Sequence, residues 1–115
     1  MTTYNPDKWL VIKVGGFSSN KKAISDDYRL VGSFFGGYTG GNSWRINSGI
    51  VRTEYKDDIY SVFGSSDSVY YCHKNTHGSH SYTDSILREL NKTYDIRILE
   101  EEESIEYLNS LLEKK

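Results

Sequence analysis

The chain has 115 residues, of which 37% are hydrophobic and 26% are charged, as expected for one compact globular domain spanning residues 1–115. With a single proline, this composition excludes the disordered and fibrous classes of protein. The net charge of −2 argues against a general polyanion binder, and no apolar run approaches the roughly 20 residues that a membrane span requires.

Five segments are predicted as β-strands from the alternation of apolar and polar residues, namely residues 8–14, 28–35, 44–55, 59–63 and 69–74. The first is apolar on both faces, so we expect it to be central and covered on both sides. In the long third segment, Gly49 invites a bulge or bend. Short turns join several of these segments, which predicts an antiparallel meander.

After residue 80 the apolar spacing changes from two residues to about 3.6, which predicts a helix over residues 81–91. A short strand over 94–99 and a second helix over 100–115 follow. The fold class is therefore α+β, with a curved five-stranded antiparallel meander followed by helix, short strand and helix. Its geometry resembles the Sm-like small barrels, although those place their helix before the strands. An open sheet with both helices across one face is the alternative.

The net charge hides a split between a basic and an acidic part. Residues 1–56 carry a balance of +4, and residues 57–115 carry a balance of −6. A basic face for single-stranded nucleic acid would use the cations of the first part, Lys13, Lys21, Lys22, Arg29, Arg45 and Arg52. The aromatic residues, 14% of the chain, could stack on nucleobases or form a subunit interface. On an acidic chain we favour the interface.

A second cluster contains the lone cysteine and all three histidines, within residues 72–80. Thiolate and imidazole groups are zinc ligands. Cys72 and His73 are neighbours on a predicted strand and point to opposite faces, so at most three ligands converge: one of these two with His77 and His80. Such a set would suit a catalytic metal. The alternative interpretation is a polar loop, with Cys72 as a small core residue.

Three segments between residues 44 and 74 together form a general sequence pattern: Trp44-Arg45-Ile46-Asn47-Ser48-Gly49-Ile50, Ile59-Tyr60-Ser61-Val62-Phe63-Gly64 and Val69-Tyr70-Tyr71-Cys72-His73-Lys74. This pattern resembles small uncharacterised proteins of tailed bacteriophages. The resemblance implies a phage-related origin and action inside a bacterial host cell, and it implies no catalytic residue.

The sequence therefore predicts a small non-enzymatic binding or assembly module, homo-oligomeric through sheet edges and exposed aromatic residues. Single-stranded nucleic-acid binding and a metal-dependent enzyme are the alternatives. We expect no cofactor and no membrane partner. The N-terminal residues lack a signal-peptide pattern and the single cysteine cannot form an intrachain disulfide, so we expect a cytoplasmic location.

Overall fold

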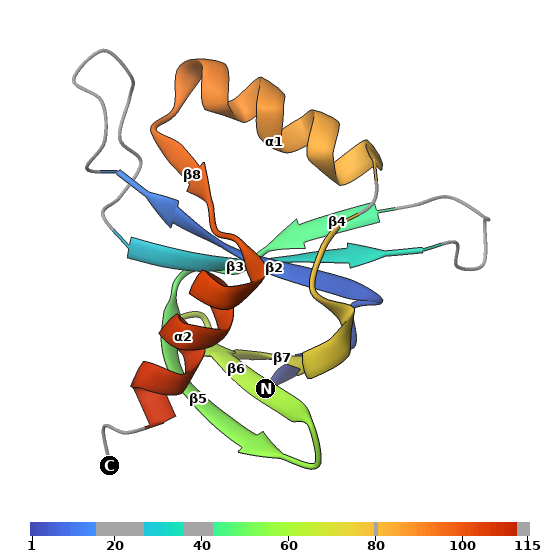
Figure 1. Cartoon of the computed structure of the whole chain (residues 1–115), viewed down its shortest axis with the longest axis vertical. Helices are drawn as coiled ribbons and strands as arrows, with labels where there is room; N and C mark the ends of the chain where they lie inside the picture. Colours follow the sequence, from blue (N-terminus) through green and yellow to red (C-terminus); the bar gives the residue numbers. More distant parts are fainter. Residues whose placement is uncertain (16–26, 36–42, 80, 113–115) are drawn as a thin grey trace.

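The computed structural model describes residues 1–15, 27–35, 43–79 and 81–112, and in these ranges the chain folds into two four-stranded sheets and two α-helices (Figure 1). Sheet I has the order β4-β3-β2-β8 and is antiparallel throughout. Its strands are β2 (Lys8–Val14), β3 (Asp27–Phe34), β4 (Ser43–Ile46) and β8 (Ile96–Ile98).

Sheet II has the order β1-β7-β6-β5 and is mixed, because β1 runs parallel to β7 while the other pairs are antiparallel. Its strands are β1 (Thr2–Tyr4), β5 (Ile50–Lys56), β6 (Ile59–Gly64) and β7 (Ser68–His73). A 3-10 turn, η1 (Lys74–Thr76), follows β7, and the helices are α1 (Ser81–Thr93) and α2 (Glu101–Leu112).

The predicted α+β class is confirmed, but the single five-stranded meander is not, and the molecule is not a closed barrel. Strands β2 to β4 belong to one sheet and β5 to β7 to the other. The segment expected as one long strand over residues 44–55 is in fact two strands, β4 and β5. The chain crosses from sheet I to sheet II between them.

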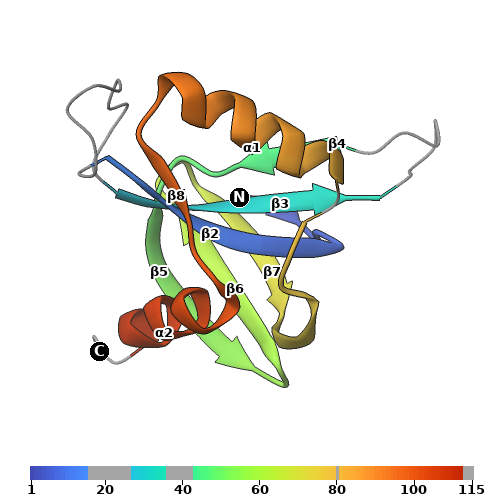
Figure 2. The same cartoon turned by 45° about the horizontal axis from the view of Figure 1, so that its top comes forward.

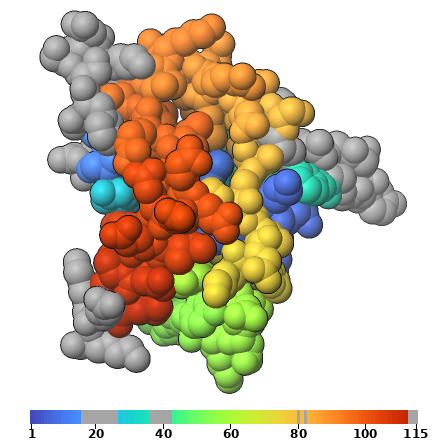
Figure 3. All heavy atoms as spheres, viewed as in Figure 1, coloured from blue at the N-terminus to red at the C-terminus, as the bar shows by residue number. Residues whose placement is uncertain are grey.

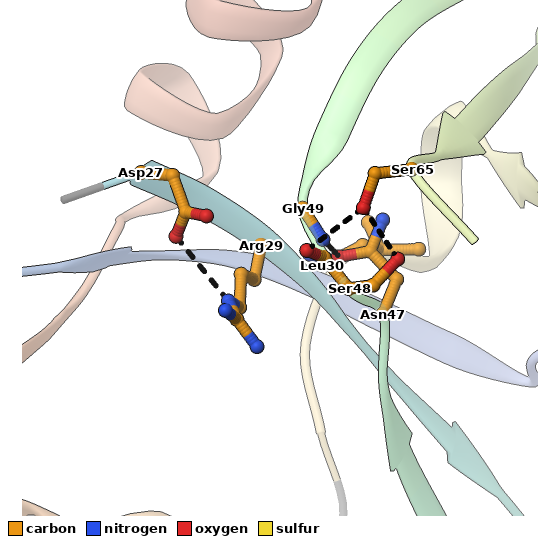
Figure 4. Close-up of polar contacts among 7 residues, drawn as sticks. All are labelled: Asp27, Arg29, Leu30, Asn47, Ser48, Gly49 and Ser65. Carbon is orange, nitrogen blue, oxygen red and sulfur yellow. Dashed lines mark hydrogen bonds and ion pairs between the residues drawn. The ribbon is translucent and has the colours of Figure 1, made fainter. Parts of the chain in front are cut away.

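Asn47 and Gly49 build this crossover (Figure 4). The backbone N–H of Asn47 donates to the carbonyl of Leu30 at 2.9 Å, and the Asn47 side-chain oxygen accepts the N–H groups of Leu30 at 2.9 Å and of Gly49 at 3.2 Å. Gly49 has a φ of 129°, a conformation that L side chains rarely adopt. The bend expected at Gly49 therefore exists, and it is large enough to change sheets.

Sheet I is covered on both faces (Figure 2). On one face Leu10, Ile12 and Val31 pack with Leu87 of α1 and Ile96 of β8. The other face meets sheet II and α2. The two-sided burial predicted for the first strand is confirmed, since Trp9, Leu10, Val11 and Ile12 are all buried.

The core between the two sheets is closed by α2. Trp9 and Val11 of sheet I pack with Tyr60 and Val62 of sheet II and with Leu108 of α2. Burying a side chain such as Leu108 stabilises the fold by roughly 1.5–3 kcal/mol. Two hydrogen bonds also tie α2 to sheet II: the Thr53 hydroxyl donates to the Leu108 carbonyl at 2.9 Å, and the Tyr60 hydroxyl to the Asn109 side chain at 2.8 Å.

Both helices and the strand between them lie close to their predicted positions. The last three residues of the second predicted helix, 113–115, lie outside the described residues. Within the described ranges, no helix has the length and apolar character needed to cross a bilayer.

Candidate functional site

A pocket of about 440 Å³ opens where the edge strands of the two sheets, β1 and β4, come together. We call it the corner pocket. It is lined by Tyr4, Asp7, Phe34, Phe35, Ser43, Trp44 and Arg45. In the space-filling view, the dark-blue N-terminal residues lie beside blue-green residues of sheet I at this corner (Figure 3). Its volume lies within the range of about 300–1,000 Å³ found for small-ligand sites.

Three planar groups form a stacked series at the corner pocket. Tyr4 stacks on Tyr70 with ring centroids 4.7 Å apart and planes inclined by 26°. The guanidinium of Arg45 lies over the Tyr4 ring, 4.6 Å from its centroid. Arg45 reaches Tyr4 because it lies opposite Gly32 in the register, in the same row as Trp9, on the face of sheet I that meets sheet II.

Tyr70 anchors this series in the core. Its side chain is fully buried, and burial raises the pKa of the phenol to about 12, an effect that nearby Arg45 partly opposes. Arg45 itself is exposed, and it has no ion pair with any residue that the structure describes. One end of the series is therefore fixed and neutral, and the other is a cation open to solvent.

Asp7 is held at the rim of the corner pocket by the end of β3. Its backbone N–H donates to the carbonyl of Ser33 at 2.9 Å, and its carboxylate oxygen Oδ2 accepts the N–H of Phe35 at 2.7 Å. The approach of this segment to β3 requires Gly32, since a Cβ there would lie 3.0 Å from the side chain of Pro6.

The four proposed cations that the structure describes, Lys13, Arg29, Arg45 and Arg52, do not share one surface. The amino group of Lys13 lies 5.0 Å from the ring centroid of Tyr28, its partner in the strand register. Arg29, which follows Tyr28 in β3, belongs to the opposite face of sheet I. Arg29 pairs with Asp27 at 3.2 Å. Arg52 lies over Phe63 of sheet II, 3.8 Å from the ring centroid. Among the four members of this set that the structure describes, only Arg45 lines the corner pocket.

Two further members of that set, Lys21 and Lys22, lie outside the described residues, so their position relative to Arg45 stays a prediction.

The acidic half of the chain has a clearer location. Its densest run, Glu100 to Glu103, lies at the start of α2, which packs against β5 at the edge of sheet II opposite β1.

The proposed metal ligands have separate roles where the structure describes them. Cys72 is fully buried in the core between the sheets, and burial raises the pKa of its thiol well above the ordinary value. His73 is exposed on the neighbouring position, and His80 lies outside the described residues. In the described ranges, no three His, Cys, Asp or Glu side chains are grouped so that they could hold a metal ion.

His77 joins the segment after β7 to α2. Its Nε2 atom lies 3.0 Å from the hydroxyl of Ser104, and its ring packs edge-on against Trp9 at 5.1 Å between centroids. Burial lowers the pKa of His77, although Glu101 and Glu100 act in the opposite direction. Because Ser104 is fully buried, this serine–histidine pair holds the fold together and offers no nucleophile to a substrate.

Arg45 is the one residue of the corner pocket that the sequence-based site list contained. The list missed the other lining residues, Tyr4, Asp7, Phe34, Phe35, Ser43 and Trp44. The N-terminal segment carries no strand pattern of its own, because β1 has only three residues and pairs with a strand more than 60 positions away. The alternation of aromatic and polar residues was the only local signal, and it does not show which rings meet.

Comparison with known proteins adds no relative: no family model matches the chain, and no curated protein or solved structure matches it significantly. Fold and site together define a small two-sheet α+β protein with an aromatic pocket at one corner, lined by one cation, Arg45, and one carboxylate, Asp7. The resemblance to bacteriophage proteins stays a prediction.

Proposed function

We propose that the protein is a non-enzymatic binding module, and that the corner pocket takes a ligand with a flat aromatic ring and a negative charge, as in a nucleotide. The observation that carries this proposal is the series Tyr70, Tyr4 and Arg45, with the guanidinium 4.6 Å from the Tyr4 centroid. Guanidinium planes, like aromatic rings, are surfaces on which proteins stack unpaired nucleobases. Because Tyr70 and Arg45 already cover the Tyr4 ring, the outer plane of the Arg45 guanidinium is the surface left for a ligand ring.

The negative charge of the ligand is favoured by Arg45. A guanidinium presents several N–H donors in one plane and forms paired hydrogen bonds with phosphate. Arg45 is exposed and has no carboxylate partner in the described part of the chain. Ligand binding would therefore break no ion pair between Arg45 and a described residue. Its contact with Tyr4 also limits the side-chain freedom that binding would otherwise cost.

The same chemistry could come from a free nucleotide or from single-stranded nucleic acid. The second source is the nucleic-acid hypothesis from the sequence, now centred on Arg45 rather than on the full set of six cations. Fluorescence anisotropy with a labelled ten-nucleotide DNA or RNA strand, competed with mononucleotides, distinguishes the two. A strand that binds no better than its monomers identifies the free nucleotide as the ligand.

Arg45→Ala tests whether the guanidinium of Arg45 binds the ligand. Losing hydrogen bonds to a charged group costs about 1.5–3 kcal/mol, so we expect affinity to fall by tenfold or more. Arg45→Lys should recover only part of the affinity, because an ammonium keeps the charge but not the plane. Arg88→Ala, an exposed arginine on α1, is the matched control and should bind like the parent. Equal binding by the Arg45 and Arg88 variants would refute the proposal.

Self-association is a second candidate function, favoured by the outer face of sheet II. In the register, Arg52, Phe63 and Thr3 lie in one row across sheet II on the side away from the core, with the fully buried Val69 between Phe63 and Thr3. Neither α1 nor α2 packs there, since both contribute to the two inner cores, and Val51 beside this row is 56% exposed.

Light scattering coupled to size-exclusion chromatography tests this candidate. A homo-oligomer formed through this face should dissociate when Phe63 is replaced by lysine, whereas Arg88→Ala should leave it intact. A parent protein that remains a monomer at high concentration and low salt removes this candidate.

A further inference from the structure

Asp7 lines the same pocket as Arg45, and only one of its two carboxylate oxygens accepts a hydrogen bond from a described residue. Oδ2 accepts the N–H of Phe35 at 2.7 Å, and the backbone of Asp7 is held to Ser33 at 2.9 Å. Oδ1 has no hydrogen-bond partner among the described residues. One hydrogen bond therefore orients the side chain and another fixes its backbone, and the exposed Oδ1 is left as an acceptor on a residue that lines the corner pocket.

An ionised carboxylate accepts hydrogen bonds and donates none. A ligand group beside Oδ1 must therefore be a hydrogen-bond donor, either the N–H of a base or the O–H of a sugar, and a carbonyl oxygen there would be repelled. Since the pocket pairs this acceptor with the cation Arg45, the two ends of a bound nucleotide are distinguishable: the phosphate meets the guanidinium and the base edge meets the carboxylate.

We propose, resting on the nucleotide-binding function above, that Asp7 determines specificity by selecting bases with N–H donors on their pairing edge. Guanine presents two neighbouring donors, the ring N1–H and the exocyclic amino group. Adenine and cytosine present one amino group beside an acceptor. Uracil and thymine present one N–H between two carbonyl oxygens, and both carbonyls face the carboxylate unfavourably. The expected order of affinity is guanine first, then adenine and cytosine, with uracil and thymine last.

Isothermal titration with GMP, AMP, CMP and UMP measures this order directly. A good base contact is worth tenfold or more in discrimination, so GMP should bind the parent protein at least about ten times more tightly than UMP. Inosine monophosphate, which lacks the exocyclic amino group of guanine, should bind more weakly than GMP. This second comparison needs no variant and so does not depend on the folding of one.

Asp7→Asn should change the order. The amide oxygen can still accept the N–H of Phe35, and the amide nitrogen then presents donors where the carboxylate presented an acceptor. The ratio of GMP to UMP affinity should fall by about tenfold or reverse. The ratio is the informative quantity, because removing a negative charge strengthens phosphate binding for all four nucleotides equally.

The outcomes separate the inference from the function on which it rests. Nucleotide binding that depends on Arg45 but shows no base preference overturns the role of Asp7 and leaves the binding function standing. A preference for guanine that persists in Asp7→Asn also overturns it. A parent protein that binds neither nucleotides nor single strands overturns both.

Discussion

Replacing Asn47 with alanine should weaken the whole fold, because this side chain holds the crossover between the two sheets. Its oxygen accepts the N–H groups of Leu30 and Gly49, and the residue is only 3% exposed. The Leu30 N–H is buried and would lose its partner. A lost hydrogen bond contributes about 1 kcal/mol and an unsatisfied buried donor costs about 1–3 kcal/mol, so we expect a loss of about 2 kcal/mol.

Urea unfolding followed by circular dichroism measures this loss. With a denaturant slope of about 1.5 kcal/mol per molar urea, typical of a small protein, the midpoint should fall by roughly 1.3 M. Asn75→Ala removes the same side chain from an exposed position on η1 and should change the free energy of unfolding by less than about 0.5 kcal/mol. If the two variants unfold at the same urea concentration, the crossover is not held as described.

Three other predictions concern backbone conformation and protonation. Gly49→Ala should cost about 1 kcal/mol or more in urea unfolding, because φ is 129° and the new Cβ would lie 3.2 Å from the Asp27 carboxylate. Because burial raises the pKa of Tyr70 to about 12, the contribution of this residue to the free energy of unfolding is complete below pH 10 and is lost as the pH rises from 10 toward 12. Tyr70→Phe should flatten this loss in thermal melts. Because the pKa of His77 is lowered, the contribution of this residue to the free energy of unfolding is complete above pH 6.5 and decreases as the pH drops below 6.5. His77→Gln should make this acid-side slope shallower.

Local sequence pattern predicted the elements of this fold better than their pairing. The two-sided apolar pattern around Trp9 and Ile12 correctly indicated a central covered strand, because alternation reports which face a side chain occupies. The turn at Asp57 and Asp58 joins β5 and β6 as antiparallel neighbours, in agreement with the short turns expected between the predicted strands, and both residues take positive φ values. Each of these features depends on residues close together in the chain.

The division into two sheets depends on distant residues and was missed. Whether a bend at Gly49 is a bulge or a change of sheet is decided by the contact of Asn47 with Leu30, 17 positions away. Likewise β8 joins β2 through pairs such as Val14 with Ile96, across more than 80 positions. No local pattern specifies such pairings.

The candidate site was predicted only in part for the same reason. The excess of cations pointed to Arg45, but the strand register divides the other described cations among different faces. Tyr4 and Asp7 enter the site through a three-residue parallel strand and a single side-chain bond to Phe35, which composition does not reveal.

The most direct test of the corner pocket is a titration of isotope-labelled protein with GMP, followed by nuclear magnetic resonance of the backbone amides. We expect the shifts to concentrate on the amides of Tyr4, Phe35 and Arg45 and to spare that of His77 beside α2. Shifts that cluster along α2, or no shifts at millimolar GMP, would contradict it.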